Sequence, residues 1–215
     1  GVTGVQTCAL PISEAAGRGP SGADGEDANV CWLPGNPVPW ALPRSTWTDF
    51  KPDPSDMDRM LPVKYVTIHH DGLTPFYGMS AFESKSRLQL ILNGHLNHRD
   101  QKWADIGYHY IVDRAGRVWQ GRDVTRWQGA HVKNRNENNI GVMCLGNFCE
   151  QRPSDAQLDA LNRVIVQLRG YYRIGPAAVY THREWPGAAT VCPGDNLQAK
   201  VRLLRKSGFK SGMLA

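Results

Sequence analysis

The sequence contains no apolar run of about 18 or more residues, so a membrane-spanning helix is not expected. Its first residues also lack the basic region and apolar core of a secretory signal peptide, which leaves the export route open. There is no block of lysine and arginine and no interleaving of basic with aromatic residues, so nucleic acid is not expected as a partner. The formal net charge is nevertheless +5, with a pI of about 9.0, which suits an anionic polymer such as a cell wall.

Cysteine is too scarce and too irregularly spaced to form a disulfide framework. The five cysteines are Cys8, Cys31, Cys144, Cys149 and Cys192. Cys144 falls inside a predicted strand, so we expect a small buried hydrophobic side chain there. A bridge among Cys31, Cys144 and Cys149 is left open, and so is the redox compartment.

The length of 215 residues and the 41% hydrophobic content predict one domain with a full core and an extension. Residues 1–29 are rich in Gly, Ala, Ser and Asp without periodicity, which predicts disorder. They are a linker or an artefact, because residues 2–12 resemble a translated sequencing adapter. Residues 30–61 are rich in proline and tryptophan and predict an extended arm laid over the domain by its aromatic rings. The domain itself is predicted over 62–209, followed by a tail at 210–215.

The pattern within the domain predicts a mixed α/β fold, with a mixed sheet of about five or six strands flanked by three main helices. The predicted strands are 63–69, 105–113, 118–120, 139–146 and 178–182. Predicted helices run from the capping-box pair Ser80 and Glu83 to about Asn97, from Ser154 to about Gly170, and over 195–206 with an N-cap near Asp195.

The segment 181–194 carries His182 and Cys192 near its two ends, across turn-forming residues. An imidazole and a thiolate are ligands that zinc prefers. Two ligands do not make a site, and the obvious source of a third is the His69-His70-Asp71 sequence at the end of the first predicted strand. Three protein ligands with a fourth position left to water are typical of a catalytic zinc site.

Only one of the two adjacent histidines can bind that ion, because successive side chains of a strand point to opposite faces. His70 shares its face with Val66 and Ile68, which indicates packing against a helix. His69 shares the other face with Thr67, which is more typical of a cleft floor.

Other polar residues carry less information by themselves. Tyr108 lies in a predicted strand, where a tyrosine is more often core or rim than catalytic. His95 and His98 lie at the end of the first predicted helix, where a cation suits the helix dipole. Asp71 either holds a ligand imidazole or points elsewhere, and the motifs identify no carboxylate base.

Several motifs occur in an order that resembles the zinc amidases of the peptidoglycan recognition protein and T7 lysozyme type, the amidase-2 group. The resemblance covers about residues 62–209. Its motifs are Ile68-His69-His70, Trp103-Ala104-Asp105-Ile106-Gly107-Tyr108, Gly121-Arg122, Gly129-Ala130-His131, Ile140-Gly141-Val142, Gly146-Asn147-Phe148, His182-Arg183 and Cys192-Pro193-Gly194. Each motif alone is weakly specific, and the ordered set is highly specific.

The resemblance implies one zinc ion held by His69, His182 and Cys192, with catalytic roles for Tyr108 and Thr190. It also implies that three residues line the substrate groove: Trp103, His131 and, less directly, His98. The chain departs from the family pattern at Asp71, where a small hydroxyl residue is common. It also has Lys102-Trp103 where a Gly-Trp pair is associated with diaminopimelate stems.

The implied activity is hydrolysis of the amide between the lactyl group of N-acetylmuramic acid and L-alanine. The implied partner is peptidoglycan, with no nucleic acid or membrane partner, and the protein is expected to be a monomer that is secreted, periplasmic or phage-encoded. The alternative is a non-catalytic peptidoglycan receptor on the same fold, which commonly lacks the third ligand that Cys192 supplies here. A structural zinc site in a nucleic-acid-binding protein would require four closed ligands, and only three are in evidence.

Overall fold

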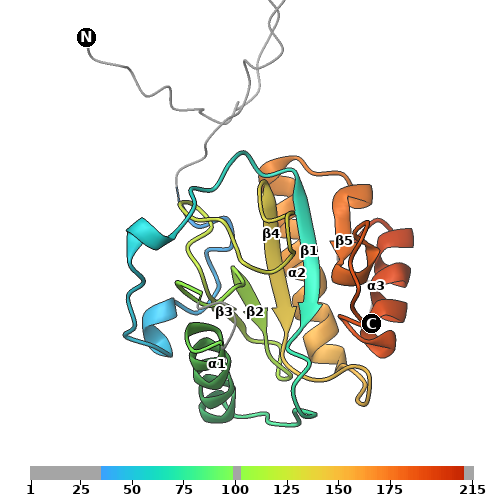
Figure 1. The fold of residues 1–215 in the computed structure, drawn as a ribbon. Coiled ribbons are helices and arrows are strands. Elements are labelled where there is room, and N and C mark those ends of the chain that lie inside the picture. Colours follow the sequence, from blue (N-terminus) through green and yellow to red (C-terminus); the bar gives the residue numbers. More distant parts are fainter. Residues whose placement is uncertain (1–34, 99–102, 211–215) are drawn as a thin grey trace, which may run out of the picture. The chain divides into compact units, whose positions relative to one another are not determined.

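The computed structural model describes residues 35–98 and 103–210 (Figure 1). The predictions for residues 1–29, for the beginning of the 30–61 arm and for the tail beyond 210 therefore lie outside the described residues. Within the described ranges, every helix is too short or too polar to cross a lipid bilayer.

Five strands form one mixed sheet, as the sequence predicts. They are β1 (Tyr65–His70), β2 (Tyr110–Val112), β3 (Val118–Gln120), β4 (Asn139–Cys144) and β5 (Val179–Thr181). The strand order is β3-β2-β4-β1-β5. β1 is parallel to both of its neighbours, whereas β3 pairs antiparallel with β2. β1 therefore lies inside the sheet, between β4 and β5.

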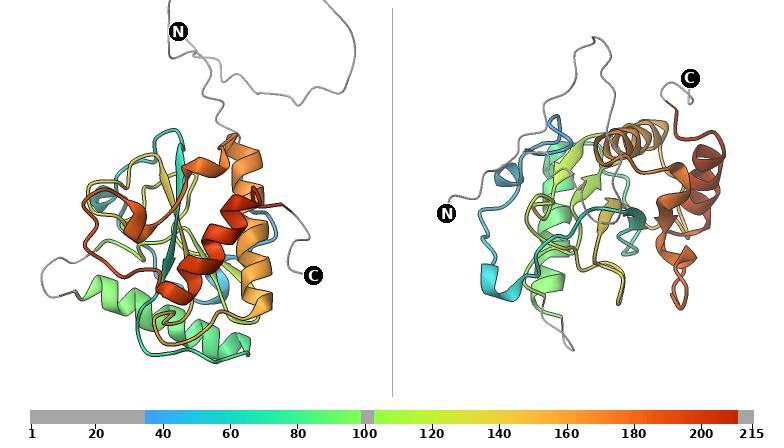
Figure 2. Two further views of the ribbon diagram at one scale, coloured as in Figure 1. Left: turned by 90° about the vertical axis from the view of Figure 1, so that its right-hand side faces the viewer. Right: turned by 90° about the horizontal axis from the view of Figure 1, so that it is seen from above.

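Three helices cover the sheet, in agreement with the predicted fold class. They are α1 (Ala81–Leu96), α2 (Asp155–Tyr172) and α3 (Asp195–Lys206). α1 lies on one face, and α2 and α3 lie on the other (Figure 2). The predicted capping box of α1 is confirmed: the Ser80 hydroxyl accepts from the Glu83 N–H at 3.2 Å, and the Glu83 carboxylate accepts from the Ser80 N–H at 3.0 Å.

Strand alternation divides the buried side chains into two clusters, one on each face of the sheet. The cluster on the α2 and α3 side includes Ile68, Tyr110 and Val142. The cluster on the α1 side includes Ile111 and Met143. Neighbours in one strand thus belong to different layers, which is the expected consequence of the two-residue period.

The predicted helix bounds are confirmed, whereas one predicted strand is much shorter than expected. α2 ends at Tyr172, close to Gly170, and its C-cap residue Arg173 adopts the left-handed conformation with φ of 56°. α3 covers the predicted residues, Asp195–Lys206, and its N-cap is the adjacent Gly194, with φ of 85°. The predicted strand 105–113 is regular only over Tyr110–Val112.

Residues 36–61 contain two short 3₁₀ turns, at Arg44–Thr46 and Pro54–Asp56. Leu42 donates its N–H to the Val118 carbonyl at 2.7 Å and accepts from the Gln120 N–H at 2.9 Å. The Trp47 indole N–H donates to the Gln120 carbonyl at 2.8 Å. This segment therefore satisfies backbone groups along β3, at the edge of the sheet.

Candidate metal centre

Three side chains from distant parts of the chain offer metal-ligand atoms at one point. His69 lies near the end of β1, His182 begins the 3₁₀ turn after β5, and Cys192 lies just before α3. One donor atom from each residue lies within 4.8 Å of the other two. The Cys192 Sγ atom is 3.6 Å from His69 Nδ1. The structure thus brings together the three ligands expected from the sequence.

The spacing of these donors fits a zinc ion. Zinc–nitrogen bonds of about 2.0–2.1 Å and zinc–sulfur bonds of about 2.3 Å at a tetrahedral angle would separate the two donors by about 3.5 Å. The observed separation between His69 Nδ1 and Cys192 Sγ is 3.6 Å. Two imidazoles and one thiol are also a donor set that suits zinc.

Burial favours the neutral form of every candidate ligand. It lowers the pKa of His69 well below its ordinary value, with further lowering by His131 and His182, and it also lowers the pKa of His182. Burial raises the pKa of the Cys192 thiol to about 12, although a hydrogen bond from the His70 backbone N–H opposes the rise. Both imidazoles therefore keep a free lone pair, and a bound cation would displace the thiol proton.

Arg183 ties the two ends of the 182–192 loop together. Its backbone N–H donates to the Cys192 carbonyl at 3.0 Å, and its guanidinium donates to the Val191 carbonyl. The same guanidinium pairs with Asp195, the first residue of α3, at 2.6 Å. The segments that carry His182 and Cys192 therefore cannot separate without breaking these contacts.

Glu184 fixes the turn that contains His182 to α3. Its carboxylate accepts from the Thr181 N–H at 2.8 Å and from the Arg205 guanidinium at 2.6 and 3.0 Å. Gln198 donates to the same carboxylate at 2.9 Å. Burial alone would raise the pKa of Glu184, but the hydrogen bonds from Arg205 and Thr181 outweigh it and lower the pKa to about 2. The group is therefore a stable carboxylate anchor for the His182 turn.

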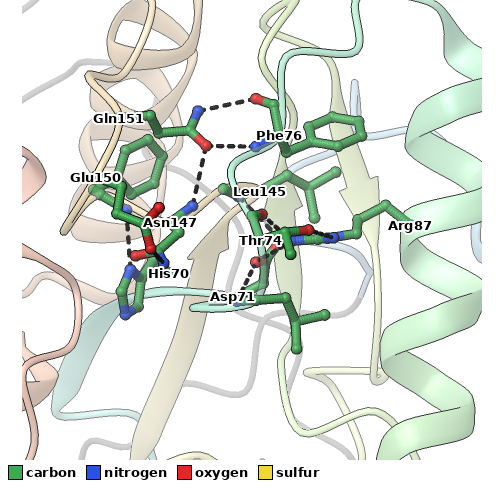
Figure 3. A network of polar contacts seen from close by, with 12 residues as sticks. His70, Asp71, Thr74, Phe76, Arg87, Leu145, Asn147, Glu150 and Gln151 are labelled. Atoms are coloured by element: carbon green, nitrogen blue, oxygen red, sulfur yellow. Dashed lines mark hydrogen bonds and ion pairs between the residues drawn. The ribbon is translucent and has the colours of Figure 1, made fainter.

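The chain that leaves β1 is anchored by an ion pair to α1. The Arg87 guanidinium donates to the Asp71 carboxylate at 2.8 and 3.0 Å and to the Thr74 carbonyl at 2.6 Å (Figure 3). The Asp71 side chain is 1% exposed, and it also accepts from the Gly146 N–H at 3.0 Å. Asp71 therefore points to Arg87, and the structure shows no hydrogen bond from it to an imidazole of the described residues.

Gln151 anchors the same segment from the opposite side. Its side-chain oxygen accepts from the Phe76 N–H at 2.5 Å, and its amide donates to the Phe76 carbonyl at 2.9 Å (Figure 3). The oxygen also accepts from the Asn147 N–H at 3.2 Å. The end of β1, where His69 lies, is thus held from both α1 and the loop before α2.

The two adjacent histidines of β1 contact different layers, as strand alternation predicts. His70 Nδ1 accepts from the Phe148 N–H at 3.2 Å, and the two rings stack. His69 instead faces Cys192 and His131, whose Nδ1 atom lies 3.0 Å from His69 Nε2.

The resemblance places His131 along the substrate groove, and the structure adds contacts that sequence reasoning missed. Besides His69, its ring contacts the Asn139 carbonyl through Nε2 at 3.2 Å. A side chain at Gly141 would clash with this ring, because a Cβ there would lie 2.7 Å from His131 Cδ2. A side chain at Gly129 would clash with the same atom. The two glycines therefore leave room for the ring, although the sequence alone connects neither of them with His131.

Tyr108 and Thr190 each lie beside one of the candidate ligands. The Tyr108 ring lies 5.2 Å from the His69 ring, centroid to centroid. Burial raises the pKa of Tyr108, and its hydroxyl makes no hydrogen bond to any residue in 35–98 or 103–210. Thr190 Oγ1 accepts from the Cys192 N–H at 3.1 Å, so its own proton is left to donate.

Trp103 packs on His95, with ring centroids 4.4 Å apart, and donates its backbone N–H to the His95 carbonyl. His95 Nδ1 accepts from the Gly107 N–H at 3.1 Å, and burial lowers the pKa of His95 to about 4. The expectation of a cation at this helix end is therefore wrong for His95. His98 is exposed beside residues 99–102, which lie outside the described ranges, and its role in the groove stays a prediction.

Cys144, Cys149 and Cys192 are free thiols. Cys144 is fully buried in β4, as predicted, and the bridge to Cys149 that the sequence left open is not formed. Cys31 and Cys8 lie outside the described residues.

Comparison with known proteins agrees with the geometry. The profile of the N-acetylmuramoyl-L-alanine amidase family (Amidase_2) matches residues 59–195, more than half of the chain. The chain belongs to this family. The matched range extends from just before β1 to the first residue of α3, so all three candidate ligands of this Amidase_2 protein lie inside it.

Curated relatives of this Amidase_2 chain include both endolysins and recognition proteins. An endolysin of Enterobacteria phage K11 is 36% identical over 110 residues, which is 49% of this chain and 70% of the endolysin. A peptidoglycan-recognition protein of Drosophila melanogaster is 30% identical over 164 residues, covering 75% of this chain and 85% of that protein. Among solved structures, Drosophila PGRP-LB superposes with a TM-score of 0.65 and 28% identity, covering 75% of this chain and 91% of that one.

Proposed function

We propose that this protein is a zinc-dependent N-acetylmuramoyl-L-alanine amidase that cleaves the amide between the lactyl group of N-acetylmuramic acid and L-alanine of the stem peptide. The convergence of His69, His182 and Cys192 within 4.8 Å carries the proposal. Membership of the Amidase_2 family supplies the reaction class.

Zinc, when bound, would polarise the amide carbonyl and lower the pKa of its water. Residues of the chain prepare the site for that ion. The neutral rings of His69 and His182 offer lone pairs, and the Cys192 thiol, whose pKa is raised by burial, would lose its proton on binding the ion. The Arg183 and Glu184 contacts hold the His182 turn against the Cys192 segment and α3.

Tyr108 and Thr190 would act as hydrogen-bond donors to the charge that develops on the amide oxygen. The raised pKa of Tyr108 keeps its hydroxyl protonated, so we assign it donation or orientation of the water rather than proton abstraction. The Thr190 hydroxyl is oriented by the Cys192 N–H, which directs the oxygen lone pair to the backbone and frees the proton.

Relatives support peptidoglycan as the partner. A PGRP-LB variant, 27% identical to this chain with a TM-score of 0.65, was solved with tracheal cytotoxin. The ectodomain complex of PGRP-LCa and PGRP-LCx, 26% identical, was solved with the same ligand. With phage endolysins also among the relatives, we infer a protein that is secreted, periplasmic or phage-encoded.

The decisive experiment is digestion of purified peptidoglycan with and without a chelator, followed by mass analysis of the soluble products. We expect free stem peptides that begin at L-alanine, their loss with the chelator and their return when zinc is added. Cys192→Ser should remove this activity while leaving the apoprotein folded, and wild-type turnover by that variant would refute the ligand assignment.

A non-catalytic receptor is the competing function, since several relatives are recognition proteins. Binding to the polymer by the zinc-loaded protein, with no released peptide, would establish the receptor and reject the amidase.

A further inference from the structure

A chain of three hydrogen-bonding groups leads from β4 to the metal centre. The Asn139 carbonyl lies 3.2 Å from His131 Nε2, and His131 Nδ1 lies 3.0 Å from His69 Nε2. The remaining nitrogen of His69, Nδ1, faces Cys192 Sγ at 3.6 Å. Each ring nitrogen of His131 and His69 therefore has one defined polar neighbour.

The Asn139 carbonyl fixes which atom donates in each of these hydrogen bonds. A carbonyl oxygen can only accept, so the proton of the neutral His131 ring must be on Nε2. His131 Nδ1 is then an acceptor, and His69 Nε2 must supply the proton between the two rings. That leaves the lone pair of the neutral His69 ring on Nδ1, directed at Cys192.

We propose that His131 is a positioning residue that holds His69 in its Nε2–H tautomer, so that Nδ1 is the metal-ligand atom. The inference rests on the proposed zinc site. In metal sites the hydrogen bond at the second ring nitrogen generally fixes the tautomer and orientation of a ligand histidine. Here a second histidine, itself fixed by a backbone carbonyl, supplies that bond.

The surroundings of His131 hold its ring in the required place. Gly141 lies under the ring on β4, and a Cβ there would come within 2.7 Å of His131 Cδ2. Gly129 leaves space on another side of the same atom. The His131 backbone N–H is held by the Asn136 side chain at 2.9 Å. The backbone of His131 is thus held by Asn136, and its ring by a polar neighbour at each of its two nitrogens.

The test compares His131→Gln with His131→Asn in the full chain. The Asn side-chain oxygen reaches about the position of Nδ1 and can still accept from His69, whereas the Gln amide lies nearer the position of Nε2 and cannot. Zinc affinity is measured by competition with a chelator, without substrate. We expect about 10- to 100-fold weaker zinc binding for His131→Gln and recovery of most of the affinity in His131→Asn.

A spectroscopic readout separates a tautomer effect from a packing effect. Ring-nitrogen shifts of His69 in the metal-free protein should report the Nε2–H form in the wild type and in His131→Asn, and a mixture of tautomers in His131→Gln. The matched control is His95→Gln, which changes a partly buried histidine whose hydrogen-bond partner is Gly107, and it should keep wild-type zinc affinity.

Gly141→Ala gives an independent test, because it keeps every donor and acceptor but pushes the His131 ring away. Weakened zinc binding in this variant would support the proposal, and wild-type affinity would count against it. Equal zinc affinity in wild type, His131→Gln and His131→Asn, or equal loss in both variants with unchanged His69 shifts, would overturn it. A wild-type protein that binds no zinc would instead reject the zinc site itself, so the two failures are distinguishable.

Discussion

The Tyr108 hydroxyl differs from the other polar groups around the metal centre, because no described residue hydrogen-bonds to it. His69, His131 and Thr190 each have at least one polar neighbour that fixes their direction. Tyr108 is half-buried, and its hydroxyl is not among the fully enclosed polar atoms that lack a partner, so the hydroxyl is open to a bound molecule. This contrast is what we would expect of a group whose partner is the substrate.

Tyr108→Phe should therefore leave zinc affinity and stability nearly unchanged while lowering the turnover of peptidoglycan about 10²- to 10³-fold, the usual loss when one donor to a developing oxyanion is removed. Release of stem peptides by the zinc-loaded variant, compared with zinc affinity from chelator competition, measures both quantities. A variant that retains wild-type turnover would exclude Tyr108 from the reaction.

The candidate ligand set that the structure brings together could be proposed from local chemistry in the sequence, since His182 and Cys192 are close together and strand alternation favours His69 over His70. The contact between His69 and His131 could not be predicted from the sequence, because the two residues are 62 positions apart and no local period connects them. Asp71 illustrates the same limit: its role depends on whether Arg87 of α1 reaches it, which is a matter of tertiary packing.

The connection between β1 and α1 depends on the buried Asp71–Arg87 pair, whose side chains are 1% and 9% exposed. Arg87→Met would leave the Asp71 carboxylate buried without its cation. We expect the free energy of unfolding to fall by about 3–5 kcal/mol, as measured by urea denaturation of the metal-free protein.

The matched control is the exposed Arg126–Asp123 pair, whose side chains are 67% and 49% exposed. Arg126→Met should change the free energy of unfolding by no more than about 0.5 kcal/mol. The double variant Asp71→Asn with Arg87→Met should be less destabilised than Arg87→Met alone, since no buried charge remains unpaired. If Arg87→Met and Arg126→Met cost the same, the buried pair has no special role.

The attachment of the His182 turn to α3 should depend on pH through Glu184. Its pKa is lowered in the folded protein to about 2 from an ordinary value of 4.5, so its stabilisation is fully present above about pH 4.5 and is lost as the pH falls toward 2. Glu184→Gln should cost about 1–2 kcal/mol at pH 7, between the values for exposed and buried pairs. In urea denaturation, the difference in free energy of unfolding between Glu184→Gln and wild type should shrink as the pH falls from 4.5 to 2. A difference that does not depend on pH would contradict the connection between the Glu184 pKa and stability.

The helices were predictable where their signals are local. The capping box at Ser80 and Glu83 marked the start of α1, because both partners lie within four residues. The start of α3 was predicted as well, since the cap residue Gly194 adjoins Asp195, whose side chain pairs with Arg183. α2 ends at Tyr172, just beyond Gly170, which is tolerated inside the helix because nothing lies within 4 Å of a Cβ built on it.

The net charge of the 215-residue sequence, +5, should act on association with an anionic polymer rather than on chemistry at the candidate metal centre. Release of stem peptides from intact cell-wall sacculi should therefore slow as sodium chloride is raised from about 50 to 500 mM, a range over which screening becomes strong. Cleavage of a small soluble muropeptide under the same conditions should change little. An equal decline on both substrates would place the salt effect at the reaction itself.

The distance along the chain between the candidate ligands has a consequence for when this protein can act. His69 and Cys192 are separated by 123 positions, and they meet only when β1 has paired with β5 and the Arg183 contacts have closed the following loop. During synthesis the N-terminal part of a chain emerges first, so His69 must wait for most of the remaining sequence. A metal could therefore be held by all three candidate ligands only after nearly the whole domain has been synthesised and folded.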